Sequence, residues 1–238
     1  MKTIKEKHPL AIRWAHWINF PVLMIMIWSG MLIYWGNDVY EFTILGHTFF
    51  KFFPAWFNKA LDIPFRLAEG MAFHFLFMWF FAINGFLYVL YTAISGEWRQ
   101  LLPNRHSFKE AWQVVLHDTG IRKTEVPKVN YNSAQKIAYT AIIIMGLGSV
   151  ATGLAIYKPV QLGWLCALFG GYAAARIIHF ALTIGYCLFF LIHIAQVIRA
   201  GWKNFQGMIT GFETVATAPP PTELPADPVI SDPQKQTA

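Results

Sequence analysis

Two histidines lie fourteen residues apart in one long apolar stretch of the sequence. They are His179 and His193, and the stretch covers residues 173–200. At about 100° per residue a helix makes nearly four turns over this spacing, so both imidazoles leave one face within about 40° of each other. At a rise of about 1.5 Å per residue they are about 21 Å apart along the helix axis. Placing polar, metal-binding side chains inside a membrane span costs free energy, so their presence indicates a functional site.

The composition is that of a membrane protein. The chain has 238 residues, of which 55% are hydrophobic and only 13% are charged, whereas a soluble domain has about 25% charged residues. The formal net charge of +6 is explained by membrane topology, so we expect no nucleic-acid partner. Cys166 and Cys187 lie in or beside apolar segments without a CxxC spacing, which indicates packing residues and neither a disulfide framework nor a thiolate metal site.

Four apolar runs are long enough to cross a bilayer. We expect an all-α membrane protein, a bundle of four transmembrane helices with these bounds: 11–35, 67–94, 133–157 and 173–200. The first run continues as a full span without a small-residue cleavage site, so it is not read as a signal peptide. Two shorter elements are expected between the spans: an aromatic stretch in the membrane interface at 49–57, and an amphipathic helix at 107–116. The latter begins with a capping-box pattern formed by Ser107 and Glu110.

The expected domain organisation is simple. Residues 1–213 form the transmembrane domain, and residues 214–238 form a Pro-rich, disordered cytoplasmic tail. We identify no internal sequence repeat. The segments on one side of the expected spans carry 14 Lys and Arg residues and those on the other side carry five, which predicts that both termini are cytoplasmic.

This topology places two more histidines at the depths of the first two. His16 in the first span matches His193 near the cytoplasmic surface, and His74 in the second span matches His179 near the external surface. Two neutral imidazoles that face each other across a helical bundle can ligate the iron of a porphyrin from both sides. A structural zinc site would require four ligands. The alternative is a non-redox membrane protein whose histidines bond to neighbouring helices. The remaining histidines lie in loops or at a terminus and are expected to be solvated: His8, His47, His106 and His117.

Three arginines lie close to the paired histidines in the sequence. Arg13 and Arg176 each precede a histidine by three residues, and Arg199 follows His193 by six. At these positions they can pair with haem propionates. They can also be ordinary positive-inside or snorkelling residues.

Four motifs in the sequence resemble those of a known family. The motifs are HPLAIRWAHWINF, GMAFHF, YNSAQKIAYT, and ARIIHF followed fourteen residues later by HI. They resemble the di-haem cytochrome b subunits of formate dehydrogenase (gamma subunit), nickel–iron hydrogenase and thiosulfate reductase, over residues 8 to about 205. The resemblance implies two haem b groups, one held by His16 and His193 and one by His74 and His179, in a bacterial inner membrane protein.

The resemblance also implies redox partners. In the formate dehydrogenase relatives a quinone pocket lies beside the cytoplasmic-side haem at the start of the third span. The matching residues here are Asn132, Ser133, Ala134, Gln135 and His193. Ala134 stands where those relatives have a glycine, and Asn132 is also a suitable N-cap for the third span.

We therefore expect a membrane-anchoring cytochrome b subunit of a respiratory chain. It would pass electrons between the quinone pool (menaquinone or ubiquinone) and a periplasmic oxidoreductase subunit of the molybdenum, nickel–iron or iron–sulfur type. The alternative with the same haems is a stand-alone enzyme, a superoxide oxidase or a transmembrane reductase. Whether the chain has quinone oxidoreductase activity of its own stays open.

Overall fold

The computed structural model describes residues 2–36, 40–61, 65–118 and 133–216. Four long helices dominate it: α1 (Leu10–Trp35), α3 (Leu67–Ser95), α6 (Ser133–Tyr157) and α8 (Tyr172–Ala200). Their bounds agree with the expected spans to within one residue. All four are long and apolar enough to cross a membrane, and Pro21 is accommodated inside α1 without ending it. The molecule is therefore a mostly helical, multi-pass membrane protein.

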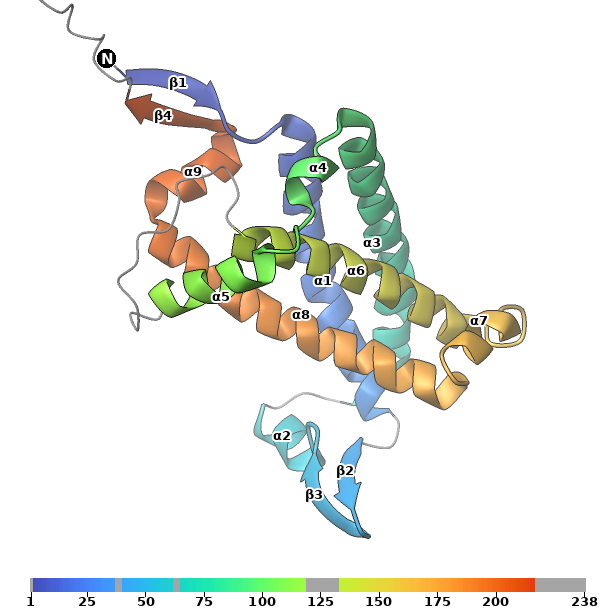
Figure 1. The fold of residues 1–238 in the computed structure, drawn as a ribbon. Helices are drawn as coiled ribbons and strands as arrows, with labels where there is room; N and C mark the ends of the chain where they lie inside the picture. The colour runs from blue at the N-terminus through green and yellow to red at the C-terminus, as the bar shows by residue number, and fades with distance from the viewer. Residues whose placement is uncertain (1, 37–39, 62–64, 119–132, 217–238) are drawn as a thin grey trace, which may run out of the picture.

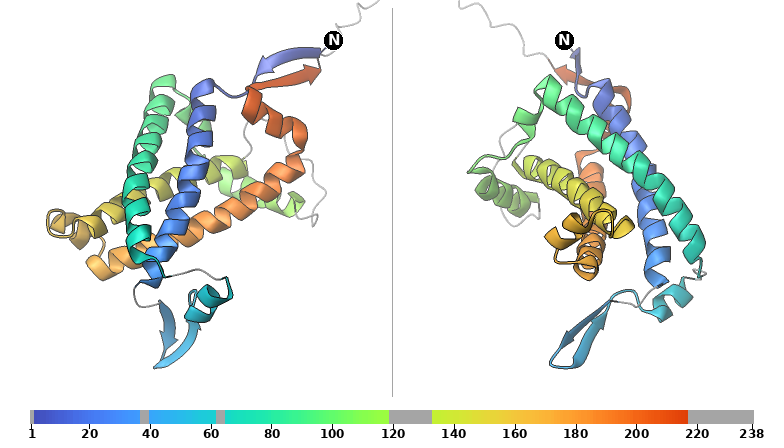
Figure 2. Two further views of the ribbon diagram at one scale, coloured as in Figure 1. Left: turned by 180° about the vertical axis from the view of Figure 1, so that it is seen from behind. Right: turned by 90° about the vertical axis from the view of Figure 1, so that its right-hand side faces the viewer.

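The long helices form two pairs that cross each other (Figures 1 and 2). Helix α1 packs along α3, and α6 packs along α8, whereas the backbones of the two pairs approach each other closely at few places. Small residues allow the close approach within each pair. Gly70 of α3 is buried against Leu32 of α1, and Ala155 and Ala175 are completely buried where α6 meets α8.

The first and the last described segments of the chain meet on one side of the bundle, which we call the terminal side. Strand β1 (Lys2–Glu6) pairs antiparallel with β4 (Phe212–Ala216), and helix α9 (Trp202–Thr210) leads from α8 into β4. Residues 214–216, the first three of the expected tail, therefore belong to a strand. The rest of that tail lies outside the described residues.

The opposite side, which we call the hairpin side, carries a β-hairpin and two short helices (Figure 1). Strands β2 (Glu41–Ile44) and β3 (His47–Lys51) pair antiparallel, and the turn between them places Leu45 and Gly46 at positive φ. Helix α2 (Ala55–Ala60) follows, and α7 (Gly163–Leu168) joins α6 to α8. The stretch expected to lie in the membrane interface thus forms β3 and α2. The four strands were not predicted.

Two more short helices lie in the described first part of the loop between α3 and α6. They are α4 (Trp98–Leu101) and α5 (Ser107–Asp118). The amphipathic helix is confirmed, but the expected capping box does not form. The Ser107 hydroxyl bonds to Asn104 at 2.9 Å, and the Glu110 carboxylate accepts a hydrogen bond from the Ser133 hydroxyl at the start of α6. That contact ties α5 to α6.

Candidate functional site

His16 and His193 face each other on the terminal side. The first comes from α1 and the second from α8, and their ring centres are 6.1 Å apart with an angle of 55° between the planes. Trp17 packs edge-on to His16 with ring centres 5.1 Å apart. Phe189, one turn before His193, stacks on that imidazole at 5.8 Å. We call these two histidines the terminal-side pair.

His74 and His179 form a second pair closer to the hairpin side. They come from α3 and α8, and their ring centres are 6.2 Å apart with an interplanar angle of 74°. The Nδ1 atom of each ring lies within hydrogen-bonding distance of a buried hydroxyl, that of Ser29 for His74 and that of Thr152 for His179. We call these two histidines the hairpin-side pair. The sequence analysis did not identify the two hydroxyl residues.

The spacing within both pairs suits one iron ion between two imidazoles. Such an iron lies about 2 Å from each ligating nitrogen, and each nitrogen lies about 1 Å from its ring centre, so the ring centres would be about 6 Å apart. Among the described residues no group of three or more His, Cys, Asp or Glu side chains converges. A metal ion held between the two imidazoles of either pair would therefore need its other ligands from a cofactor such as a porphyrin.

Contacts between the start of α1 and the segment after α8 position the terminal-side pair. The Arg13 guanidinium donates to the Ile209 carbonyl at 2.6 Å, and the Trp17 indole donates to the Met208 carbonyl at 3.1 Å. Gly211, at φ +89°, leaves room for Arg13, because a Cβ at this glycine would lie 2.9 Å from the guanidinium. We call these contacts, together with the β1–β4 sheet, the terminal clamp. It holds the start of α1 against the segment that follows α8.

Aromatic packing positions the hairpin-side pair. Phe180, next to His179, stacks on Tyr34 of α1 with ring centres 4.7 Å apart. The Tyr34 hydroxyl donates to the Phe52 carbonyl at 2.7 Å and accepts from the Tyr40 amide at 2.8 Å. The segments around the hairpin are thereby fixed to the start of α8. The sequence showed the aromatic residues but not which helix they meet.

The three arginines predicted near the haems have different surroundings. Arg13 takes part in the terminal clamp, and its Nε is buried without a partner among the described residues. Arg176 lies over the rings of Tyr40 and Tyr172, 5.8 and 5.9 Å from their centres. Burial raises the pKa of the Tyr40 hydroxyl, and the neighbouring Arg176 acts in the opposite direction. Arg199 is in the last turn of α8.

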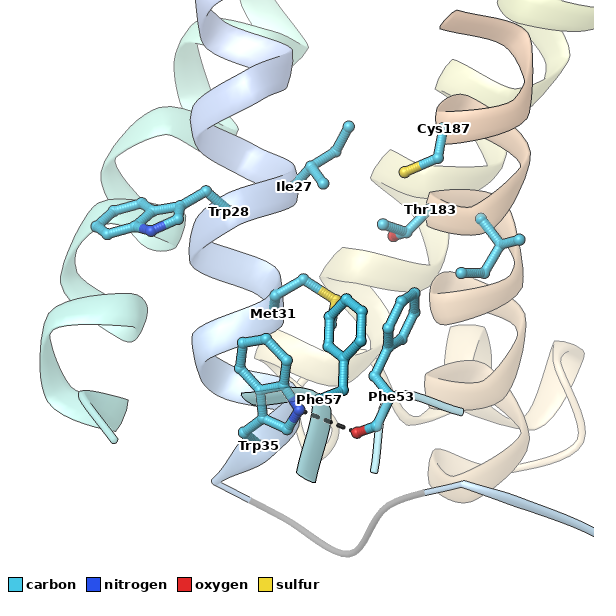
Figure 3. Close-up of a pocket in the computed structure, with 9 residues that line it drawn as sticks. Ile27, Trp28, Met31, Trp35, Phe53, Phe57, Thr183 and Cys187 are labelled. Carbon is cyan, nitrogen blue, oxygen red and sulfur yellow. Dashed lines mark hydrogen bonds between the residues drawn. The ribbon is translucent and has the colours of Figure 1, made fainter. Parts of the chain in front are cut away.

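An apolar cavity of about 250 Å³ lies between α1, α8 and the segment around α2 (Figure 3). Thr183, one turn after His179, is on its wall, and the Trp35 indole closes its lower end by donating to the Phe53 carbonyl at 3.1 Å. Its lining is Ile27, Trp28, Met31, Trp35, Phe53, Phe57, Thr183, Ile184 and Cys187. The cavity is thus at the depth of the hairpin-side pair and suits an uncharged, flat group.

Three of the expected quinone residues lie at the start of α6, on the terminal side, and His193 lies in α8. Ser133 bonds to Glu110, Ala134 is half-buried and Gln135 is exposed. Asn132 lies outside the described residues. Of the four histidines expected to be solvated, His47 and His106 are exposed, and His8 donates its backbone amide to the Gly211 carbonyl. The side chain of His117 lies outside the described part of the chain.

A family model and a known protein each match most of this chain. Residues 7–211 match the family model described as prokaryotic cytochrome b561. A protein of Azospira oryzae, named "putative protein-methionine-sulfoxide reductase subunit YedZ1", is 29% identical over 197 residues, which cover 82% of this chain and 92% of that protein. The range matched by the family model contains the positions of all four paired histidines. The chain therefore belongs to the prokaryotic cytochrome b561 family and is a membrane protein that uses haem b in electron transfer.

Proposed function

We propose that this protein is a di-haem subunit that passes electrons across the bacterial inner membrane, between the quinone pool and an oxidoreductase on the periplasmic side. The observation that carries the proposal is the geometry of α8. It gives one histidine to each of two pairs, fourteen residues apart, and both pairs have the ring separation that an axially ligated iron requires.

Each haem would be held by residues that the structure brings together. His16 and His193 would ligate one iron, and His74 and His179 the other. The apolar cavity beside the hairpin-side pair suits the methyl and vinyl edge of a porphyrin. Arg176 is the cation best placed for the propionates of that haem, since it lies one turn before His179. Arg13 and Arg199 are the candidates for the other haem. When bound, each haem takes up and releases one electron, and bis-histidine ligation leaves no open position for oxygen.

The orientation in the membrane follows from the distribution of positive charge. The β1–β4 sheet puts both described chain ends on the terminal side, and this side carries most Lys and Arg residues. It would face the cytoplasm, so the terminal-side haem would lie near the cytoplasmic surface and the hairpin-side haem near the periplasm. The quinone would bind at the start of α6, near His193, where Ser133 and Gln135 offer polar groups.

The periplasmic partner is inferred from the relative. That protein is named as a subunit of a methionine sulfoxide reductase, which suggests that substrate chemistry takes place in another chain. The hairpin side has the exposed apolar side chains that a docking surface needs, among them Phe42, Leu45 and Phe49. A molybdenum-type reductase subunit, or a nickel–iron or iron–sulfur one, would dock there.

The test is a haem count on the full-length purified chain. We expect two haem b per chain by the pyridine haemochrome assay, and one in each of the variants His16→Ala and His179→Ala. His47→Ala, which removes an exposed histidine of β3, is the matched control and should keep two. Unchanged haem content in both ligand variants would contradict the pairing.

Purification from native membranes then distinguishes a subunit of an oxidoreductase complex from a stand-alone redox enzyme. Recovery of a periplasmic oxidoreductase with the tagged chain supports the subunit function. A chain that purifies alone and turns over superoxide or an external acceptor with quinone would instead be a stand-alone enzyme.

A further inference from the structure

The histidines of the hairpin-side pair rest on buried hydroxyl groups. Ser29 of α1 is completely buried, and its Oγ lies 3.0 Å from Nδ1 of His74. The same Oγ donates to the Ile25 carbonyl at 2.7 Å, with the Met26 carbonyl at 3.2 Å. A hydroxyl has a single proton, and here a backbone carbonyl takes it. The oxygen is therefore left as an acceptor for a proton on the imidazole, beside the Met26 carbonyl that faces the same ring.

Thr152 of α6 repeats this arrangement for His179. It is also completely buried, and its Oγ1 lies 2.9 Å from Nδ1 of His179. It donates to the Gly148 carbonyl at 2.7 Å, with the Ser149 carbonyl at 3.4 Å. Both hydroxyls thus use their proton on the preceding turn of their own helix and offer a lone pair to a histidine of the next long helix.

A glycine completes each of these contacts. Gly30 follows Ser29, and Gly153 follows Thr152. A Cβ at either glycine would lie 3.3 Å from Cε1 of the imidazole that its neighbour holds. We call each hydroxyl–glycine dipeptide a histidine seat. The two seats lie on different helix pairs and form a local repeat that the sequence analysis missed.

Among the residues that the structure describes, the terminal-side pair has no such seat. Nδ1 of His16 is buried and has no hydrogen-bond partner among the described residues. His193 is packed by the ring of Phe189. The two pairs therefore resemble each other in spacing but differ in what fixes each imidazole.

We propose that Ser29 and Thr152 are positioning residues for the periplasmic-side haem; this rests on the proposed haem ligation by His74 and His179. By accepting from Nδ1–H, each hydroxyl holds its imidazole in the tautomer whose Nε2 lone pair points to the partner ring. It also fixes the plane of the ring and makes the ligand more basic. A more basic ligand stabilises ferric iron, so the two hydroxyls lower the midpoint potential of this haem.

The test compares substitutions at the two hydroxyl positions and at one control position, in the full-length chain loaded with haem. Thr152→Val keeps the shape of the side chain without its hydroxyl, and Thr152→Ser keeps the hydroxyl without the methyl group. Thr92→Val is the matched control, because Thr92 is 4% exposed and bonds to the Tyr88 and Val89 carbonyls in the same way, but has no histidine partner among the described residues. The readouts are the potential of each haem in a redox titration and the low-field EPR signals, which report ligand-plane orientation.

We expect Thr152→Val to raise the potential of one haem and to move its EPR signal, while the other haem is unchanged. Thr152→Ser and Thr92→Val should leave both haems as in the wild type, and Ser29→Ala should shift the same haem as Thr152→Val. If Thr152→Val loses that haem and Thr152→Ser keeps it with the normal potential, the proposal is also supported.

Two results would overturn it. One is a Thr152→Val protein with two haems and unmoved potentials and EPR signals. The other is loss of the haem in both Thr152 variants, which would mean that packing and not the hydroxyl matters. A wild-type chain without haem would instead refute the proposed function, so the two failures are distinguishable.

Discussion

Gly153 decides how closely His179 approaches helix α6. A Cβ at this position would lie 3.3 Å from Cε1 of the imidazole, closer than an ordinary contact. We expect Gly153→Ala to displace the ring and to lower the temperature at which haem is lost from the hairpin-side pair. Overpacking of this kind costs about 1–3 kcal/mol, which exceeds the gain of about 1 kcal/mol from replacing a helical glycine by alanine. The measurement is haem absorbance during a thermal ramp.

Gly85→Ala is the control for this substitution. Gly85 lies within α3, and nothing is within 4 Å of a Cβ built there, so only the gain in helix propensity should remain. Haem retention in Gly153→Ala equal to that in Gly85→Ala would show that His179 does not need the close approach.

Arg13 shows what the sequence could not reveal at the level of one residue. Three residues before His16, it has the spacing of a propionate partner, and that role remains a prediction. The structure adds a contact with the Ile209 carbonyl, nearly two hundred residues away. No local pattern predicts such a partner, whereas the depth of His16 in its span follows directly from helix geometry.

The terminal clamp is the element that places His16 against His193. Gly211 within it has φ +89°, and its Cβ would meet the Arg13 guanidinium at 2.9 Å. We expect Gly211→Ala to weaken the clamp and to lower haem occupancy at the terminal-side pair, while the hairpin-side pair keeps its haem. Haem content and the EPR signals of the two haems would show this selective loss.

A matched control separates the clamp from backbone strain. Gly96, at the C-cap of α3, also has a positive φ, +76°, and its Cβ would meet only the end of the Arg99 side chain at 3.6 Å. Alanine in this conformation costs about 1–2 kcal/mol at either position. Equal haem loss in Gly96→Ala and Gly211→Ala would mean that the clamp has no specific effect.

The elements differ in how far the sequence predicts them. The long helices are set by apolar length, which a bilayer demands, and their ends agree with expectation to within one residue. The β1–β4 sheet joins residues 2–6 to residues 212–216, and such a pairing has no periodic signal at either end. The hairpin at 41–51 was missed because its aromatic residues also suit the membrane interface.

At the scale of the whole molecule, the two helix pairs share little protein core. Their contacts across the gap include the imidazole pairs and aromatic stacks such as Tyr34 on Phe180 and Phe20 on Phe190. The matching depths of the four histidines were predictable from topology. The crossing of the pairs and the hydroxyl seats were not, since both depend on how helices from different parts of the chain pack together.

This architecture predicts an ordered route for electrons. If quinol reacts near His193, an electron must pass through the terminal-side haem before it reaches the hairpin-side haem, whose ligand is about 21 Å away along α8. We expect His16→Ala, which lacks the first haem, to retain a second haem that dithionite reduces but quinol does not. Rapid mixing of anaerobic, detergent-solubilised protein with a quinol, followed at the haem absorbance, measures this difference.

His74→Ala provides the reciprocal control. It lacks the hairpin-side haem, and its remaining haem should still be reduced by quinol as fast as in the wild type, because nothing on the terminal side has changed. If the opposite pattern is found, with quinol reducing the haem of His16→Ala but not that of His74→Ala, quinol reacts on the hairpin side. The polar residues at the start of α6 would then have another role, although both haems could still lie on one path along α8.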